Sequence, residues 1–242
     1  MDVVIVKNYI EMSKHTAGMV GDLIKHQEKP ILGLATGGTP IGMYQLLVRQ
    51  YREGLLSFKH VRSFNLDEYI GLDPTHAKSY HRYMNEHLFL HVDMPFHQTY
   101  VPDGMAKNLD KVCRSYEKLL KKIGPPDLQI LGIGENGHIG FNEPGSDFNG
   151  HTHVIRLADS TREANARYFQ SIDEVPTHAI TMGIKSILRS KKIVLMASGE
   201  KKAAAVKRLL EGSPDEDFPA SALCRHPNVT LVADEAAFGQ ND

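Results

Sequence analysis

Short runs of apolar and β-branched residues alternate along the chain with longer stretches in which apolar residues recur at helical spacing. Nine short runs predict strands, at residues 2–6, 30–35, 60–65, 98–102, 127–133, 152–157, 178–182, 192–197 and 228–233. The clearest helical patterns lie between them, at residues 40–52, 78–90, 107–123, 159–169 and 199–211. This alternation predicts an α/β fold in which a mostly parallel sheet carries helices on both faces.

The chain has 242 residues and contains no internal repeat, low-complexity tract or linker that would mark a domain boundary. We therefore expect a single domain. Ligands of open parallel sheets bind beyond the carboxyl ends of the strands. The loops that follow the predicted strands are where a functional site is expected.

The charge balance argues against two classes of partner. The 28 Lys and Arg residues against 29 Asp and Glu leave no excess of positive charge for a nucleic acid or an anionic membrane. The amino-terminal residues lack the pattern of a secretory signal, and no apolar run approaches the roughly 20 residues that span a bilayer. With only two cysteines, Cys113 and Cys224, the sequence predicts a cytoplasmic protein without a four-cysteine zinc site.

Residues 131–144 read LGIGENGHIGFNEP, and Gly132, Gly134 and Gly137 have the spacing of a dinucleotide-binding turn. Asp159, about 22 residues further on, stands near the position of a ribose-binding acid. Such a turn needs a helix that begins at the third glycine, but Pro144 and further glycines interrupt the residues that follow. The sequence therefore favours a long loop after a buried strand over a nucleotide site.

That loop carries His138 and Glu143 among small residues. A histidine and a carboxylate on one loop can form a general base and its orienting partner. The alternative is a turn with a capping histidine and a solvated glutamate. Local sequence alone does not choose between these two interpretations.

A second loop, ATGGTP at residues 35–40, lies between a predicted strand and a predicted helix. We expect Thr39 to be the N-cap and Pro40 the first helical residue, which would leave the amides of Gly37, Gly38 and Thr39 free for an anion. The loop lacks the GKS or GKT of a nucleoside triphosphate site, so a single phosphate is the better guess. A tight turn that needs glycine for positive φ is the structural alternative.

A third loop, FNLDEYIG at residues 64–71, places Asp67 and Glu68 directly after a predicted strand. One carboxylate could remove a proton from a bound carbon acid, while the other could bond backbone amides or cap a turn. A metal site is the competing interpretation of paired acids. HEXXH is absent, and the HxH at His151 and His153 lacks an evident third ligand, so we predict no metal.

The chain contains, in this order, TGGTP (36–40), FNLDEYIG (64–71), LGIGENGHIGFNEPGS (131–146), STREANARYF (160–169) and SGEKKAAAV (198–206). In this combination it resembles the glucosamine-6-phosphate deaminase family, also called glucosamine-6-phosphate isomerases. The resemblance implies a modified Rossmann-like α/β domain over residues 1–242 with a mobile lid near residues 158–178. It also implies deamination of glucosamine 6-phosphate to fructose 6-phosphate and ammonia during amino-sugar catabolism, without a cofactor. Because water enters as ammonia leaves, we class the activity as that of a hydrolase.

The resemblance also implies roles for individual residues. His138 would open the sugar ring, and Asp67 would remove the proton from C2 of the open sugar. Glu143 would orient and polarise His138. Asn136 stands where many family members have Asp, and the resemblance places it in the catalytic set. Its amide can form hydrogen bonds but carries no charge.

The phosphate of the substrate would bind the amides of the ATGGTP loop, and two basic residues would match the family's cationic partners. This predicted substrate-binding set consists of Thr36, Gly37, Gly38, Thr39, Arg167 and Lys201.

Two rival functions of the same fold remain. Lactonases of 6-phosphogluconate share similar glycine loops but typically continue toward ASLFP where this chain reads IGFNEP. A non-catalytic sugar-phosphate sensor would have lost Asp67 or His138. Longer hexameric members carry basic activator residues where this chain has His153 and Ile155, so we expect no such activation. For the assembly we expect a monomer or a small homo-oligomer.

Overall fold

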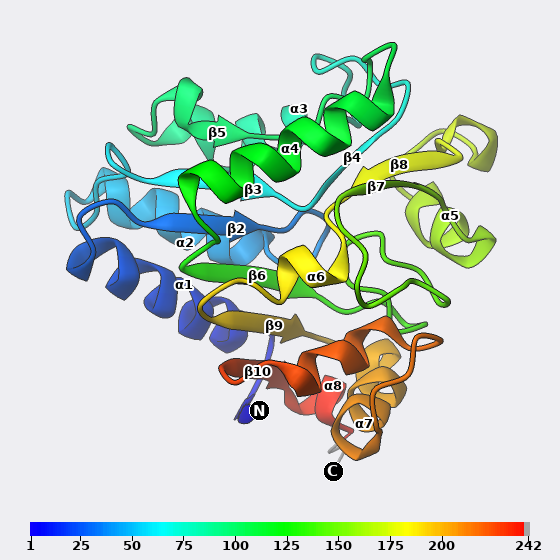
Figure 1. Ribbon diagram of the computed structural model, residues 1–242. Coiled ribbons are helices and arrows are strands. Elements are labelled where there is room, and N and C mark those ends of the chain that lie inside the picture. The colour runs from blue at the N-terminus through cyan, green and yellow to red at the C-terminus, as the bar shows by residue number, and fades with distance from the viewer. Residues whose placement is uncertain (240–242) are drawn as a thin grey trace.

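The computed structural model describes residues 1–239 and contains a central seven-stranded sheet (Figure 1). Every neighbouring pair of strands in it is parallel, in the order β1-β10-β9-β6-β2-β3-β5. The bounds are β1 (Asp2–Val6), β2 (Ile31–Leu34), β3 (Arg62–Asn65), β5 (Thr99–Tyr100), β6 (Leu128–Gly132), β9 (Ile193–Ala197) and β10 (Val229–Asp234). The predicted parallel α/β sheet is confirmed.

Helices cover both faces of this sheet. Right-handed crossovers between parallel strands place α1 and α2 on one face, and α4 and α6 on the other, as Figure 1 shows. The helices are α1 (Tyr9–His26), α2 (Ile41–Arg52), α3 (Tyr80–His87), α4 (Leu109–Ile123), α5 (Asp159–Ala166), α6 (Ile184–Ile187), α7 (Ala203–Glu211) and α8 (Glu235–Phe238). Strands covered on both faces are mostly apolar, which is why β2 and β9 read as continuous hydrophobic runs.

A second, three-stranded sheet corrects part of the predicted topology. The strands β7 (His153–Arg156) and β8 (His178–Thr181) do not join the parallel sheet but pair antiparallel with each other. Their third partner is β4 (Asp67–Tyr69), which pairs antiparallel with β8 and was expected to be a loop. The sequence does not predict this strand, because the polar pair Asp67–Glu68 interrupts the apolar pattern that indicates a strand.

Most helix ends follow their local signals. Asn8, Ser79 and Asn108 accept a hydrogen bond from the backbone in the first turn of α1, α3 and α4. Helix α2 differs from the prediction, because its N-cap is Pro40 and its first residue is Ile41. Helix α1 was not among the clear predictions, and its two glycines, at positions 18 and 21, explain the weak signal.

Within residues 1–239, no helix combines the length and the apolar composition that crossing a membrane would require.

We predict that Gly183 is needed where β8 leads into α6. A Cβ atom there would lie 2.3 Å from the carbonyl oxygens of both Gly150 and His151, which are backbone atoms that cannot swing away. Gly183→Ala should lower the free energy of unfolding by about 1–3 kcal/mol. Gly18→Ala is the matched control, because nothing lies within 4 Å of its added methyl in α1, and it should gain about 0.5–1 kcal/mol. Urea denaturation measures both, and equal stabilities of the two variants would contradict the packing argument.

Candidate active site

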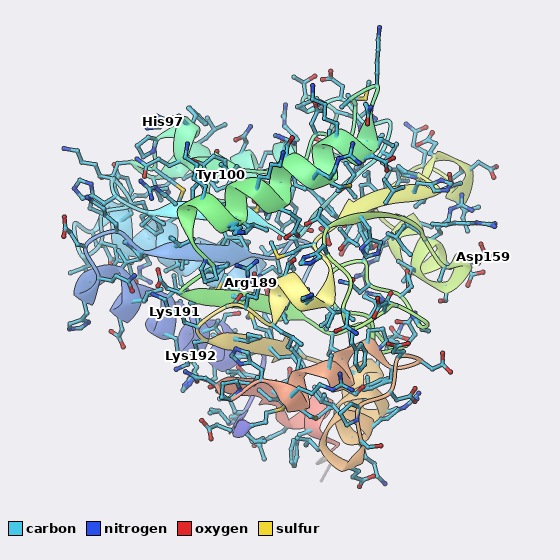
Figure 2. All side chains as sticks on the ribbon, in the orientation of Figure 1. His97, Tyr100, Asp159, Arg189, Lys191 and Lys192 are labelled. Carbon is cyan, nitrogen blue, oxygen red and sulfur yellow. The ribbon has the colours of Figure 1, made fainter. Side chains whose placement is uncertain are left out.

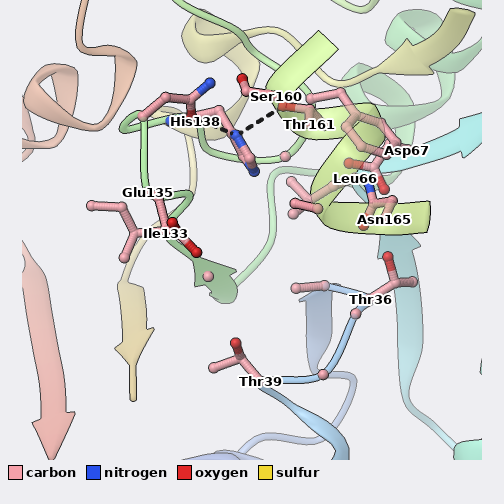
Figure 3. Close-up of a pocket in the computed structure, with 18 of the residues that line it drawn as sticks. Thr36, Thr39, Leu66, Asp67, Ile133, Glu135, His138, Ser160, Thr161 and Asn165 are labelled. Atoms are coloured by element: carbon pink, nitrogen blue, oxygen red, sulfur yellow. Dashed lines mark hydrogen bonds between the residues drawn. The ribbon is translucent and has the colours of Figure 1, made fainter. Parts of the chain in front are cut away.

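A cavity of about 260 Å³ opens at the carboxyl ends of β2, β3 and β6. It lies where the chain direction across the sheet reverses, since β2 connects toward β3 and β6 toward β9. This is the position at which open parallel sheets bind ligands. The structure brings all three predicted loops to this cavity, together with residues of α5 (Figure 3).

The loop that follows β2 supplies one wall, with Thr36, Gly37, Gly38 and Thr39. Gly37 has φ of 84°, which the side chains of other residues rarely allow. No group in the described part of the chain accepts a hydrogen bond from the amides of Gly37, Gly38 or Thr39. These amides are therefore available to an anion, although Thr39 is not the N-cap that the sequence suggested.

Tyrosine side chains from two helices hold this loop in place. Tyr83 of α3 donates to the carbonyl oxygen of Gly37 at 2.6 Å, and Tyr9 of α1 donates to that of Gly38 at 3.3 Å. The Tyr9 hydroxyl in turn accepts from the amide of Gly42 at 2.8 Å. The loop carbonyls thus point toward the protein, which fits a loop whose amides face the cavity.

Asp67 lies at the opposite wall, buried at the start of β4. Burial and the neighbouring Glu68 carboxylate raise its pKa to about 8, although the backbone amide of Phe141 opposes the shift. The site therefore contains a carboxyl group whose proton affinity is close to that of a neutral-pH general base.

Glu68 has a structural role, as one of the two sequence alternatives proposed. Its buried carboxylate accepts from the backbone amides of Tyr80 and His81 at 2.9 and 3.0 Å, at the start of α3. It also pairs with the His81 ring at 3.0 Å. Glu68 thereby fixes the helix that carries Tyr80 into the cavity.

His138 faces the cavity from the loop after β6, and its orientation is set by Asn136. The His138 Nδ1 atom lies 2.7 Å from Oδ1 of Asn136, which also accepts from the His138 amide at 3.1 Å. The Asn136 amide nitrogen donates to Glu143 at 3.0 Å, which fixes the direction of the amide group. Because Oδ1 only accepts, the His138 proton sits on Nδ1 and the lone pair on Nε2.

Glu143 acts on His138 mainly through Asn136. Its carboxylate is buried behind the cavity wall, 3.7 Å from the His138 Nδ1 atom, and accepts from the amide of Ala158 at 3.3 Å. Burial lowers the pKa of His138, while the negative charge of Glu143 opposes the shift and Lys202 adds to it. Figure 3 also shows Thr161 of α5 beside Nδ1, at 3.5 Å.

The cationic end of the cavity is formed by Arg167 and Lys202. The predicted residue Lys201 is exposed and is not among the residues that line the cavity, whereas its neighbour Lys202 is. Burial lowers the pKa of Lys202, and Glu135 on the opposite loop opposes that shift. Sequence alone could not choose between adjacent lysines in the 3₁₀ turn Glu200–Lys202, where one position decides which side chain faces inward.

Several lining residues were missed by the sequence analysis, among them Tyr80, Glu135 and Thr161. Tyr80 reaches the cavity only because α3 packs against β4. No local sequence pattern predicts this packing of α3. Glu135 and Thr161 lie within the sequence motifs at residues 131–146 and 160–169, so their positions in these motifs could have identified them as candidates.

The nucleotide interpretation fails on geometry. After Gly137 the chain runs through turns to β7, and no helix begins there to hold a pyrophosphate. Asp159 lies on α5 at the outer edge of the molecule, away from β6 (Figure 2). For the metal interpretation, residues 1–239 contain no cluster of three or more His, Cys, Asp or Glu that could hold an ion.

Comparison with known proteins gives matches over nearly the whole chain. A sequence model of the family described as glucosamine-6-phosphate isomerases/6-phosphogluconolactonase matches residues 8–232. The glucosamine-6-phosphate deaminase of Bacillus velezensis is 52% identical over 239 residues, which cover 99% of each chain. Glucosamine-6-phosphate deaminase 1 of Bacillus subtilis is 50% identical over 237 residues, or 98% of each chain.

Solved structures show the same relationship. A structure described as a monomeric glucosamine-6-phosphate deaminase covers 100% of both chains with a TM-score of 0.98 and 49% identity. The 6-phosphogluconolactonase of Thermotoga maritima covers 96% of this chain and 98% of its own, with a TM-score of 0.76 at 20% identity. The second likeness establishes a shared fold alone.

The contact between Asn136 and His138 gives a prediction for the isolated protein. Asn136→Asp places a carboxylate charge beside the Nδ1 atom of His138. It should raise the pKa of the His138 ring, because the charge favours the imidazolium form. The control Asn136→Leu, similar in size but without an acceptor, should give no such increase. Histidine ring titration followed by NMR measures both, and an unchanged pKa in Asn136→Asp would contradict the assigned contact.

Proposed function

The chain belongs to the family of glucosamine-6-phosphate isomerases and 6-phosphogluconolactonases, and we propose that its cavity carries out the isomerising deamination of glucosamine 6-phosphate to fructose 6-phosphate and ammonia. The observation that carries this function is the pairing of two proton-transfer groups, Asp67 and His138, in a cavity with a free anion-binding loop. Identity of about half over the full length of the deaminases supports it.

The phosphate binds at the loop after β2 in this proposal. Amides of Gly37, Gly38 and Thr39 donate to its oxygens, and Arg167 and Lys202 supply charge from the other side. Holding the remote phosphate positions the reacting carbons between the two acid-base groups.

His138 opens the pyranose ring. Its unprotonated Nε2 atom, which has no partner among the described groups, takes the proton of the C1 hydroxyl and delivers it to the ring oxygen. The C1–O5 bond breaks and C1 becomes a carbonyl. A lowered pKa suits this step, because the imidazole must be neutral to accept the proton.

Asp67 then removes the C2 proton, which the new C1 carbonyl acidifies. The electron pair forms the C1–C2 double bond while the π pair of the carbonyl moves to O1, which gives an enolamine, an enolate that carries the C2 amine. Asp67 returns its proton to C1, and a proton of the amine passes to O1. The resulting C2 imine adds water and expels ammonia, which leaves the ketone of fructose 6-phosphate. Asp67 must be ionised at the start, so its raised pKa makes it both a stronger base and a pH-sensitive one.

The label hydrolase, expected from the sequence, is not right for this activity. Proton transfers at C1 and C2 isomerise the sugar, and water only completes the last step. Among similar proteins, hydrolysis is the reaction of the distant lactonases, with which the chain shares the fold at about 20% identity.

The lid, the quaternary structure and the location form part of the same proposal. Residues 158–178 contain α5 and, directly after it, Arg167, which lines the cavity. Arg162 ties the segment together by donating to the carbonyls of Ile172 and Val175. Closure of this lid would exclude water from the enolamine. We take the protein as a monomer, since the similar solved structure is described as monomeric. A cytoplasmic location follows from its charged substrate, which a bilayer excludes.

Incubation of the purified protein with glucosamine 6-phosphate tests the function directly. Ammonia and fructose 6-phosphate should appear in equal amounts and at equal rates. Acid release from a 6-phosphogluconate lactone without ammonia from the amino sugar would favour the hydrolase alternative. Binding of the sugar phosphate without any turnover would favour the sensor.

Asp67→Asn should abolish proton transfer at C2 while leaving substrate binding nearly intact. Loss of a general base costs about 10²- to 10⁴-fold in rate. The measurement is incorporation of solvent deuterium at C1 of the product, together with kcat and KM. Deuterium incorporation at the rate of the unaltered protein would exclude Asp67 as the base.

The pKa of about 8 for Asp67 also predicts a pH profile. Since the raised pKa leaves Asp67 protonated below that value, kcat/KM should fall about tenfold per pH unit below pH 8. Glu68→Gln removes one cause of the shift, so the acid limb should move to lower pH, provided circular dichroism shows the fold intact. Titration of the substrate itself would leave the limb in the same place in both proteins.

A further inference from the structure

One carboxylate in the cavity has no part in the mechanism above. Glu135 lines the cavity from the loop after β6, three positions before His138. It is exposed, and no hydrogen bond or ion pair engages its carboxylate among residues 1–239. Figure 3 shows its side chain directed into the cavity.

Glu135 lines the same cavity as the two cationic side chains, Arg167 and Lys202. The groups that respond to its charge are Lys202 and His138, whose pKa values it raises against the effect of burial. Asp67 is not among them, and Figure 3 shows Asp67 on the other side of the cavity beside Asn165. Two positive charges and one negative charge therefore share the end that receives the phosphate.

We propose that Glu135 acts as a resident counter-ion of Lys202 that competes with the phosphate of the substrate and limits how tightly phosphorylated ligands are held. This rests on the proposed function. A phosphate dianion at Lys202 and Arg167 meets the Glu135 carboxylate at the same end, and like charges repel. Because substrate and product carry the same phosphate, the carboxylate weakens the binding of both equally. It thereby keeps the product from being retained.

The opposite role for the carboxylate makes the opposite prediction. If Glu135 held the ammonium group at C2 of the substrate, removing the Glu135 carboxylate would weaken the binding of glucosamine 6-phosphate. The binding of ligands without nitrogen would not change. The side on which Glu135 lies favours the phosphate, but the two roles differ in sign and are separable by experiment.

The test is Glu135→Gln, which keeps the size and removes the charge. We expect KM for glucosamine 6-phosphate and the inhibition constants of fructose 6-phosphate and inorganic phosphate to fall together, by about two- to fivefold, the range of one exposed ion pair. The effect should shrink at high ionic strength. Glu163→Gln is the matched control, since it removes one negative charge from α5 outside the cavity and should change none of these constants.

Each outcome has one meaning. Unchanged constants for inorganic phosphate, in a protein that releases ammonia from glucosamine 6-phosphate, would overturn the counter-ion role alone. A raised KM for the amino sugar with unchanged phosphate inhibition would overturn it in favour of ammonium binding. Failure of the unaltered protein to release ammonia would instead refute the proposed function on which the inference rests.

Discussion

The position of β2 between β6 and β3 is the constraint on which the site depends. From β2 the chain turns toward β3 and β5, whereas from β6 it turns toward β9 and β10 on the other side of the sheet. The two loops therefore diverge as they leave the sheet, and the space between them is not filled by either connection. Parallel pairing brings both loops to one edge, so residues about 100 positions apart, such as Thr36 and Asn136, line one cavity.

Burial affects the protonation of Asp67 and His138 in a consistent way. It raises the pKa of Asp67 and lowers that of His138, so the uncharged form is favoured in both. The formal charges of the cavity are concentrated at Arg167, Lys202 and Glu135, where the phosphate is proposed to bind. Recognition of the anion and chemistry at the sugar carbons thus occupy electrically different ends of one cavity.

The sequence predicted nine strands and the two glycine-rich loops, at residues 35–40 and 131–144, because apolar runs and glycine-rich turns are local signals. It did not predict β4 or the separate antiparallel sheet, since which strands pair is decided by contacts remote in sequence. The same limit explains why Lys201 was chosen over Lys202, and why Tyr80 was missed. Asp67 and His138 were candidates from the chemistry of their loops and Arg167 was found through resemblance, and all three line one cavity.

The antiparallel sheet has a consequence for how this fold can vary. The connection from β7 to β8 contains α5, and both of its ends are fixed by strand pairing, with Thr181 of β8 opposite Asp67 of β4. An insertion or deletion in that connection changes the residues beside the cavity, while β4, which carries Asp67, keeps its register. Selection for larger or smaller ligands can therefore act on one surface segment, and the position of Asp67 is insulated from the change.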